Sequence, residues 1–156
     1  MKAHVLFCLI LIIVLIGCGC THKKNGAETY ADGETGLLLV KGDKYCREIK
    51  SETMWQVERE GKFSSFQEAD RYAANLKLGG YDDWRLPTRS ELFNLFYIFY
   101  RNKNNDCIMN VNGDFWVTLK NQGSTPGHWE VYHLCGPEYK FVESLKTKGY
   151  VRAVRP

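Results

Sequence analysis

Histidine and cysteine are the residue types in this sequence whose positions could support catalysis or metal binding. His128 and His133 lie five residues apart in a segment of alternating polarity, so on a strand they would face opposite sides and could not share a metal ion. A cysteine- or metal-dependent enzyme is the alternative to a protein that only binds a ligand. It would require Cys107 or Cys135 to be a free thiol. Nucleotide-binding glycine loops, zinc-protease motifs and serine-hydrolase elbows are missing. We therefore expect no catalytic residues, no bound metal and no enzymatic activity.

One short segment leaves calcium open as a cofactor. Residues 110–114 read Asn-Val-Asn-Gly-Asp and offer the carboxylate, amide and carbonyl oxygens that Ca²⁺ prefers. Their spacing does not match that of a known calcium loop. Calcium is therefore the alternative to the expectation of no cofactor.

The N-terminus is typical of an exported protein. A basic start is followed by an apolar run from Val5 to Ile16, which is the pattern of a secretory signal peptide and is shorter than the ~20 residues of a membrane span. The run ends in Leu-Ile-Gly-Cys, which resembles a bacterial lipobox with Cys18 as the acylated residue. We predict a signal peptide over 1–17, a lipidated tether over 18–33 and a single domain over 34–156. The protein would then be held on a membrane of the cell envelope, the outer membrane if the host has two, with its domain outside the cytoplasm.

Four cysteines remain outside the signal peptide and the lipidation site. Disulfides persist outside the cytoplasm, and four cysteines allow three pairings. We favour a bridge between Cys107 and Cys135, because both lie in loop-rich sequence of the C-terminal half. Cys20 and Cys46 would then be left to pair with each other.

Binding is the better functional class for the loop-rich half of the chain. The net charge is only +3, whereas binding of nucleic acid needs a concentrated basic face. Nucleic acid is therefore not an expected partner. Aromatic rings stack on sugars or anchor protein contacts, and cations attract sulfate or carboxylate. In the other interpretation, Trp116 and Trp129 are core residues of short strands, and the lysines on the loops are solvated without a ligand. The candidate ligand residues are Lys103, Trp116, Lys120, Trp129, Tyr132, Tyr139 and Lys140.

The apolar periodicity predicts an α+β fold with two helices. Ser65 and Glu68 form a capping box that begins the first helix. An apolar face continues this helix to Leu76, and Gly79 is expected to end it. Thr88 and Glu91 form the same device for a second helix. Short strands are expected at 36–40, 45–49, 52–57, 115–118, 129–134 and 150–155, with another beginning at 141, and a turn at 60–62.

The link between the two helices is the most distinctive stretch. It runs from Gly79 to Leu92 as Gly-Gly-Tyr-Asp-Asp-Trp-Arg-Leu-Pro-Thr-Arg-Ser-Glu-Leu. Trp84 is expected to be buried beside the first helix. The guanidinium group of Arg85 suits a bidentate pair with a carboxylate, and Asp82, Asp83 and Glu91 are the candidates. The alternative is an anion site that Arg85 forms with Arg152 or Arg155 of the last strand.

This stretch, with Met54-Trp55-Gln56 and the C-terminal Val151-Arg152-Ala153-Val154-Arg155, resembles the Lcl C-terminal domain family, which is named for a bacterial collagen-like adhesin. The resemblance covers Thr53 to Arg155. Its motif residues here are Trp55, Trp84, Arg85, Pro87, Glu91, Arg152 and Arg155.

The resemblance implies a C-type-lectin-like fold, in which two helices pack on a twisted, mostly antiparallel sheet with long loops. It also implies an exported, often lipid-anchored protein that binds a glycan or an envelope protein without catalysis. Formylglycine-generating enzymes share the broad fold and use a paired-cysteine copper site, which Cys107 and Cys135 could mimic. A purely structural envelope role is a further alternative. The chain has no Gly-X-Y collagen repeat, unlike the adhesin.

Overall fold

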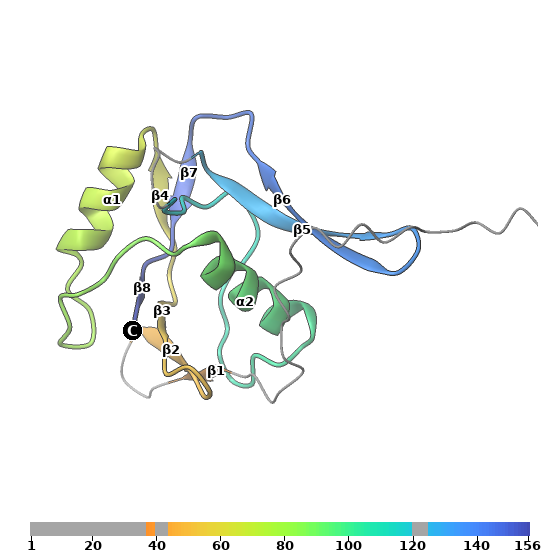
Figure 1. Ribbon diagram of the computed structural model, residues 1–156. Coiled ribbons are helices and arrows are strands. Elements are labelled where there is room, and N and C mark those ends of the chain that lie inside the picture. The colour runs from red at the N-terminus through yellow and green to blue at the C-terminus, as the bar shows by residue number, and fades with distance from the viewer. Residues whose placement is uncertain (1–36, 40–43, 120–124) are drawn as a thin grey trace, which may run out of the picture. The chain divides into compact units, whose positions relative to one another are not determined.

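The computed structural model describes residues 37–39, 44–119 and 125–156 of the chain. These residues belong to one compact unit, Ala31–Pro156, and form an α+β arrangement of two helices and small antiparallel sheets (Figure 1). The signal peptide, Cys18, the tether and Lys120 lie outside the described residues. No helix in the part of the chain that the structure describes is long and apolar enough to cross a membrane.

The largest sheet has four antiparallel strands in the order β1-β2-β3-β8. Its strands are β1 (Leu37–Leu39), β2 (Tyr45–Glu48), β3 (Met54–Gln56) and β8 (Val154–Arg155). Two further pairs complete the strands: β4 (Glu60–Phe63) with β7 (Gly149–Val151), and β5 (Gly127–His133) with β6 (Pro137–Glu143). The predicted strands around β1, β2, β3 and β5 are thereby confirmed. The strand that was expected to begin at 141 is β6, which begins earlier, at Pro137.

Strand β4 was not expected, because its sequence reads as a turn. Glu60, Gly61 and Lys62 are all exposed, so the strand has no alternation of buried and exposed residues. Its only strand partner among the described residues is β7, and the register shifts between Glu60 and Phe63. A short strand that packs on one neighbour leaves no apolar pattern for sequence analysis to detect.

The predicted last strand is divided in two. β7 pairs with β4, and β8 pairs with β3, so the chain changes partners at Arg152 and Ala153. Both residues are completely buried. At this interruption the Arg152 side chain donates to the backbone carbonyls of Gln56, Val57 and Asn110.

Residues 115–118 were predicted as a strand and instead form isolated bridges. Phe115 bridges Gly127 and Tyr150, and Thr118 bridges Thr88. Phe115, Trp116 and Val117 are buried, so the segment passes through the interior as an extended link.

Both helices begin at the predicted caps. At the start of α1 (Phe66–Asn75), the Ser65 side chain accepts a hydrogen bond from the Glu68 amide. The Glu68 carboxylate accepts from the Ser64 amide and not from the Ser65 amide, so only half of the predicted capping box is formed. The complete capping box of Thr88 and Glu91 opens α2 (Arg89–Tyr100).

The prediction that Gly79 ends the first helix is wrong. α1 ends at Asn75, and Gly79 and Gly80 form the two-residue turn that joins Leu78 to Tyr81. Both glycines have positive φ, +63° and +82°, which this kind of hairpin turn requires at its two central positions.

Two clusters of buried side chains form the core. The first gathers Trp55, α2 and Phe115, and the second gathers α1, Trp84 and Trp116. Trp84 is 2% exposed and packs with α1 residues, as predicted. Trp116 is 4% exposed and donates from Nε1 to the Phe63 carbonyl, so it is a core residue and not a ligand residue.

The disulfide joins Cys46 of β2 to Cys107, not Cys107 to Cys135. Both bridged cysteines are completely buried in the first core cluster, whereas Cys135 is exposed in the turn between β5 and β6 and has a free thiol. The predicted pairings of Cys107 with Cys135 and of Cys20 with Cys46 are therefore wrong. Cys46 faces the core because it pairs with buried Trp55 across the sheet, and the loop after α2 brings Cys107 to it.

Candidate functional site

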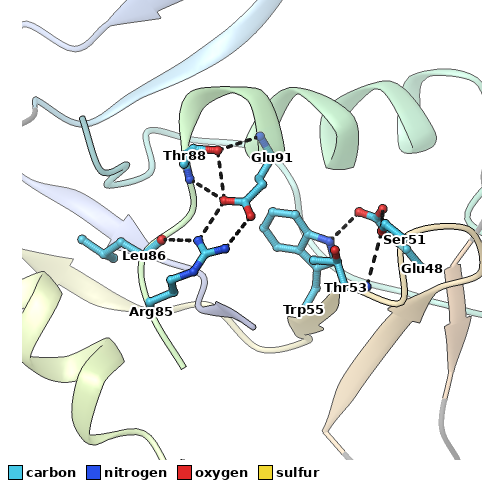
Figure 2. A network of polar contacts seen from close by, with 8 residues as sticks. All are labelled: Glu48, Ser51, Thr53, Trp55, Arg85, Leu86, Thr88 and Glu91. Carbon is cyan, nitrogen blue, oxygen red and sulfur yellow. Dashed lines mark hydrogen bonds and ion pairs between the residues drawn. The ribbon is translucent and has the colours of Figure 1, made fainter. Parts of the chain in front are cut away.

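The best-ordered polar network lies at the start of α2. Arg85 donates from its two terminal nitrogens to the two carboxylate oxygens of Glu91, at 2.9 and 2.6 Å. The same carboxylate accepts from the Thr88 amide at 2.8 Å and from the Thr88 hydroxyl at 3.0 Å. Figure 2 shows this network at the N-terminal end of the helix. Of the three candidate carboxylates, Glu91 is therefore the partner of Arg85.

These contacts keep Glu91 ionised. Burial alone would raise its pKa, but the hydrogen bonds from Arg85 and the Thr88 amide outweigh that effect and hold the pKa below its usual value. Negative charge is also favoured at a helix N-terminus. The network links the chain before α2 to the helix itself, so it positions α2 against the rest of the domain.

Trp55 belongs to a second internal network, also drawn in Figure 2. Its Nε1 donates to the Glu48 carboxylate at 2.8 Å, and the Ser51 hydroxyl donates to the other oxygen of the same group. Glu48 is 8% exposed and Trp55 is completely buried. The buried indole N–H and the buried carboxylate therefore satisfy each other.

The two C-terminal arginines have partners of different kinds. Arg155 donates to both oxygens of Asp83, at 2.5 and 3.0 Å, and its guanidinium group lies 3.8 Å from the centre of the Tyr81 ring. Arg152 donates only to backbone carbonyls, those of Gln56, Val57 and Asn110. Arg85 and Arg155 are thus each occupied by a separate carboxylate, and the predicted anion site that joins Arg85 to Arg152 or Arg155 is not formed.

A pocket of about 360 Å³ lies between α2, the segment 111–115 and β5. Its walls are mostly apolar, with polar groups from only a few residues. The apolar lining consists of Leu92, Leu95, Phe96, Phe99, Tyr100, Val111, Phe115 and Trp129. Asn112, Gly113, His128 and Arg152 complete the wall. Such a cavity, apolar with a few polar groups, is the usual form of a small-ligand or side-chain binding site.

Trp129 and Phe93 fix one wall of this pocket. Their rings meet edge to face with centres 4.7 Å apart, and Trp129 Nε1 donates to the Arg89 carbonyl at 3.2 Å. These contacts hold β5 against α2. The tryptophan is therefore pre-positioned at the pocket and needs no rearrangement to contact a ligand.

His128 lies between two carboxylates in the pocket wall. Its Nδ1 is 2.7 Å from Asp114 Oδ1, and its Nε2 is 2.9 Å from Glu130 Oε1. Partial burial would lower the pKa of His128, but the hydrogen bonds to Glu130 and Asp114 outweigh it and raise the pKa. Both ring nitrogens of His128 are therefore occupied, and its two acidic partners lie beside the pocket, outside its lining.

The comparison with known families identifies the domain. Residues 44–155 match the Lcl C-terminal domain, which is most of the chain and the range that holds all the elements except β1. The chain belongs to the Lcl C-terminal domain family. No curated protein and no solved structure shows significant similarity to it.

Among the residues that the structure describes, Trp129 is the only predicted ligand residue that contributes to the pocket of this Lcl C-terminal domain. Tyr139 packs among the rings of α2, with its centre 5.3 Å from that of Phe93. Tyr132 is 40% exposed on β5, and Lys103 and Lys140 are exposed. The lysines and aromatic residues singled out in the sequence thus do not converge on one site in the described structure.

The pocket residues of α2 were interpreted as core residues. The prediction that Leu92, Leu95, Phe96 and Phe99 lie on one packed face is confirmed for Leu92 and Leu95, which are buried in the first core cluster, and for Phe99, which packs against it. All four side chains also line the pocket. A signal for this was present in the sequence. The helix reads Arg-Ser-Glu-Leu-Phe-Asn-Leu-Phe-Tyr-Ile-Phe-Tyr and carries more apolar residues than one buried stripe requires.

Several oxygens of the candidate calcium segment are already engaged. The Asn110 carbonyl accepts from Arg152 and the Asn112 carbonyl accepts from Arg59, while Asp114 contacts His128 and Ser144. Within residues 44–119 and 125–156, no group of three or more His, Cys, Asp or Glu side chains is placed to hold a metal ion. Two guanidinium groups on this loop argue against a divalent cation there.

Proposed function

We propose that this chain is a lipid-anchored bacterial envelope protein whose C-type-lectin-like domain binds another envelope component without catalysis. The N-terminal sequence supports export and acylation at Cys18, and the family match supports the domain type. The observation that carries the binding function is the pocket beside α2, whose walls are apolar and partly solvent-accessible.

The lining of the pocket favours a segment of an envelope protein as the ligand. A cavity of about 360 Å³ with aromatic and aliphatic walls suits one large apolar side chain of a partner. A glycan is the second candidate, because Trp129 and Tyr100 provide rings on which a sugar could stack.

The cysteine pairing argues against one form of the enzymatic alternative, the paired-cysteine metal site, because Cys107 is bridged to Cys46 and Cys135 is left alone on the hairpin. The exposed Cys135 still provides the free thiol that a cysteine-dependent enzyme requires. A purely structural envelope role requires no ligand and leaves the pocket unexplained.

Photo-crosslinking from the pocket tests the protein-binding function in cells. A photoreactive residue replaces Tyr100, which lines the pocket and is 39% exposed, or Tyr132, which is 40% exposed on the hairpin and outside the pocket lining. We expect a discrete crosslink to one envelope protein from position 100 and none from position 132. The crosslink should disappear when Val111→Trp fills the pocket. Equal crosslinking from both positions, or none from position 100 together with no glycan bound on an array, would contradict the proposal.

The anchor is tested separately by the intact mass of the protein extracted from membranes. We expect a mature chain that begins at Cys18 and carries a diacylglyceryl group, with or without a third acyl chain. An unmodified N-terminus would remove the anchor and leave the pocket proposal standing.

A further inference from the structure

We propose that the pocket recognises an apolar group that bears a carboxylate, as a C-terminal apolar residue of an envelope protein presents it. The apolar body would lie against α2 and Trp129, and the carboxylate would face the wall formed by Asn112, Gly113 and Arg152. This inference rests on the proposed function and specifies its ligand.

Arg152 carries a buried charge that no acid neutralises directly. The side chain is completely buried, and it makes no ion pair within 4.0 Å among the residues that the structure describes. Burial lowers its pKa to about 10, with the nearby charge of Arg59 adding to the effect and that of Glu58 opposing it. The group therefore stays protonated at neutral pH. Buried charges are normally paired, because taking an ion out of water is costly.

The Nε atom of Arg152 is also without a hydrogen-bond partner. The terminal nitrogens donate to the carbonyls of Gln56, Val57 and Asn110, but the buried Nε donates to nothing in the structure. Arg89 Nε is the other buried side-chain donor without a partner among the described residues, but Arg89 does not line the pocket. Most buried donors in folded proteins are satisfied, so a ligand oxygen in the pocket could supply the acceptor that Arg152 Nε lacks. Arg152 contributes to the pocket wall, next to Phe115, whose ring centre lies 5.6 Å from the guanidinium carbon.

Arg59 adds a second positive charge on the same side. It donates to the Asn112 carbonyl, and its guanidinium carbon lies 3.8 Å from the centre of the Tyr150 ring. Arg59 also makes no ion pair within 4.0 Å in the described structure. Charges in a cavity of low polarity act more strongly than in water, so the two arginines would attract an anion to this wall.

The uneven lining of the pocket determines which way such a ligand lies. His128 is the lining residue on one side, and Asp114 and Glu130 contact it from outside the lining, so a carboxylate beside His128 would lie near two negative charges. α2 contributes only apolar side chains and Tyr100 to the lining. The anionic end of the ligand is therefore expected at Arg152 and Arg59, and its apolar end against the helix.

A matched pair of peptides tests the proposal on the full-length protein. Acetyl-Ala-Ala-Ala-Phe is added either as the free acid or as the C-terminal amide, which differ only in the charge at the proposed contact. Binding is followed by NMR through the indole N–H signal of Trp129, which Trp129→Phe assigns among the four tryptophans. We expect the Trp129 signal to shift with both peptides and the acid to bind about tenfold more tightly, as one charge-assisted hydrogen bond predicts.

The outcomes separate this inference from the binding function. Equal affinity for acid and amide would overturn the carboxylate preference and leave the pocket as a binding site. No shift of Trp129 with either peptide would overturn the inference, and the crosslinking test would then decide whether the pocket binds another envelope component. As a charge-matched comparison, Arg59→Gln should reduce the preference for the acid several-fold, whereas Arg71→Gln, on the exposed surface of α1, should leave it unchanged. An equal effect of the two substitutions would mean that the preference comes from net charge alone.

Discussion

Glu91 serves two purposes with a single carboxylate. It completes the capping box of α2 and forms a bidentate pair with Arg85, so its two oxygens accept from Arg85, the Thr88 amide and the Thr88 hydroxyl. Arg85 is 42% exposed, so water weakens the ion pair, but the helix cap does not depend on that charge pair.

Glu91→Gln should therefore destabilise the domain by about 1–2 kcal/mol at pH 7, the range of a helix cap and of one charged hydrogen bond. The folded-state pKa of Glu91 is lowered, so its stabilisation is present above the unfolded-state pKa and is lost as the pH falls through the folded-state value. Urea unfolding should show a difference between wild type and variant that shrinks toward zero in acid. Glu68→Gln, at the same position of α1 and exposed, is the matched control and should cost less than about 0.5 kcal/mol. A cost as large as that of Glu91→Gln would contradict the special role of Glu91.

Gly79 and Gly80 allow a second test at the level of single residues. Both have positive φ, so alanine at either position costs about 1–2 kcal/mol of backbone strain. A Cβ at Gly79 would also overlap the buried ring of Tyr45, whereas a Cβ at Gly80 would meet nothing within 4 Å. Gly79→Ala should therefore lower the free energy of unfolding by at least about 1 kcal/mol more than Gly80→Ala. Equal losses in thermal or urea unfolding would show that the Tyr45 contact is unimportant.

At the level of elements, the β5–β6 hairpin has two ends with different surroundings. Gly127, at the start of β5, exchanges backbone hydrogen bonds with Phe115 and is buried. Residues 132–138, around the turn, are all exposed, and they include Leu134 at 89% exposure. The turn therefore relies on the hairpin's own ladder, while the base is part of the core.

Hydrogen exchange should reveal this gradient. We expect the amides of residues 132–136 and 138 to exchange much faster than those of Gly127 and Phe115, because local opening at the turn exposes no apolar core. The amides of β3, in the centre of the four-stranded sheet, provide the slow reference. Protection at the turn that equals that of β3 would indicate that another surface covers the hairpin in solution.

At the level of the whole domain, the disulfide joins parts of the chain that are far apart in sequence. Cys46 and Cys107 are separated by 61 residues, and the bridge ties the four-stranded sheet to the segment that follows α2. Closing a loop of this length removes about 4 kcal/mol of unfolded-state entropy in the chain-entropy model.

Replacing both bridged cysteines by alanine should therefore destabilise the domain by about 3–5 kcal/mol, whereas Cys135→Ala should change stability by less than about 0.5 kcal/mol. Peptide mapping after thiol labelling of the native protein checks the pairing itself. The label should appear on the peptide that contains Cys135, and on those of Cys46 and Cys107 only after reduction. Labelling of Cys107 without reduction would contradict the bridge to Cys46 and restore the paired-cysteine form of the enzymatic alternative.

The sequence by itself determined the local elements and the family. Ser65 and Thr88 were recognisable as helix caps, and Trp84 as a buried residue, because these properties depend on neighbours within a few positions. The family motif likewise lies mostly in one continuous stretch, so the family match over 44–155 agrees with it. For Arg85, the sequence predicted that its partner is a carboxylate and left three candidates. The helix cap explains why that partner is Glu91.

Only the tertiary structure decided the long-range contacts. The partner of Cys107, the division of the last strand at Arg152 and the pocket beside α2 depend on segments that are far apart in sequence. A cysteine carries no local mark of its partner, and an arginine on a strand reads as exposed unless the carbonyls that it will contact are known. The same apolar side chains can fill a core or line a cavity, and the choice depends on how closely β5 and residues 111–115 approach the helix.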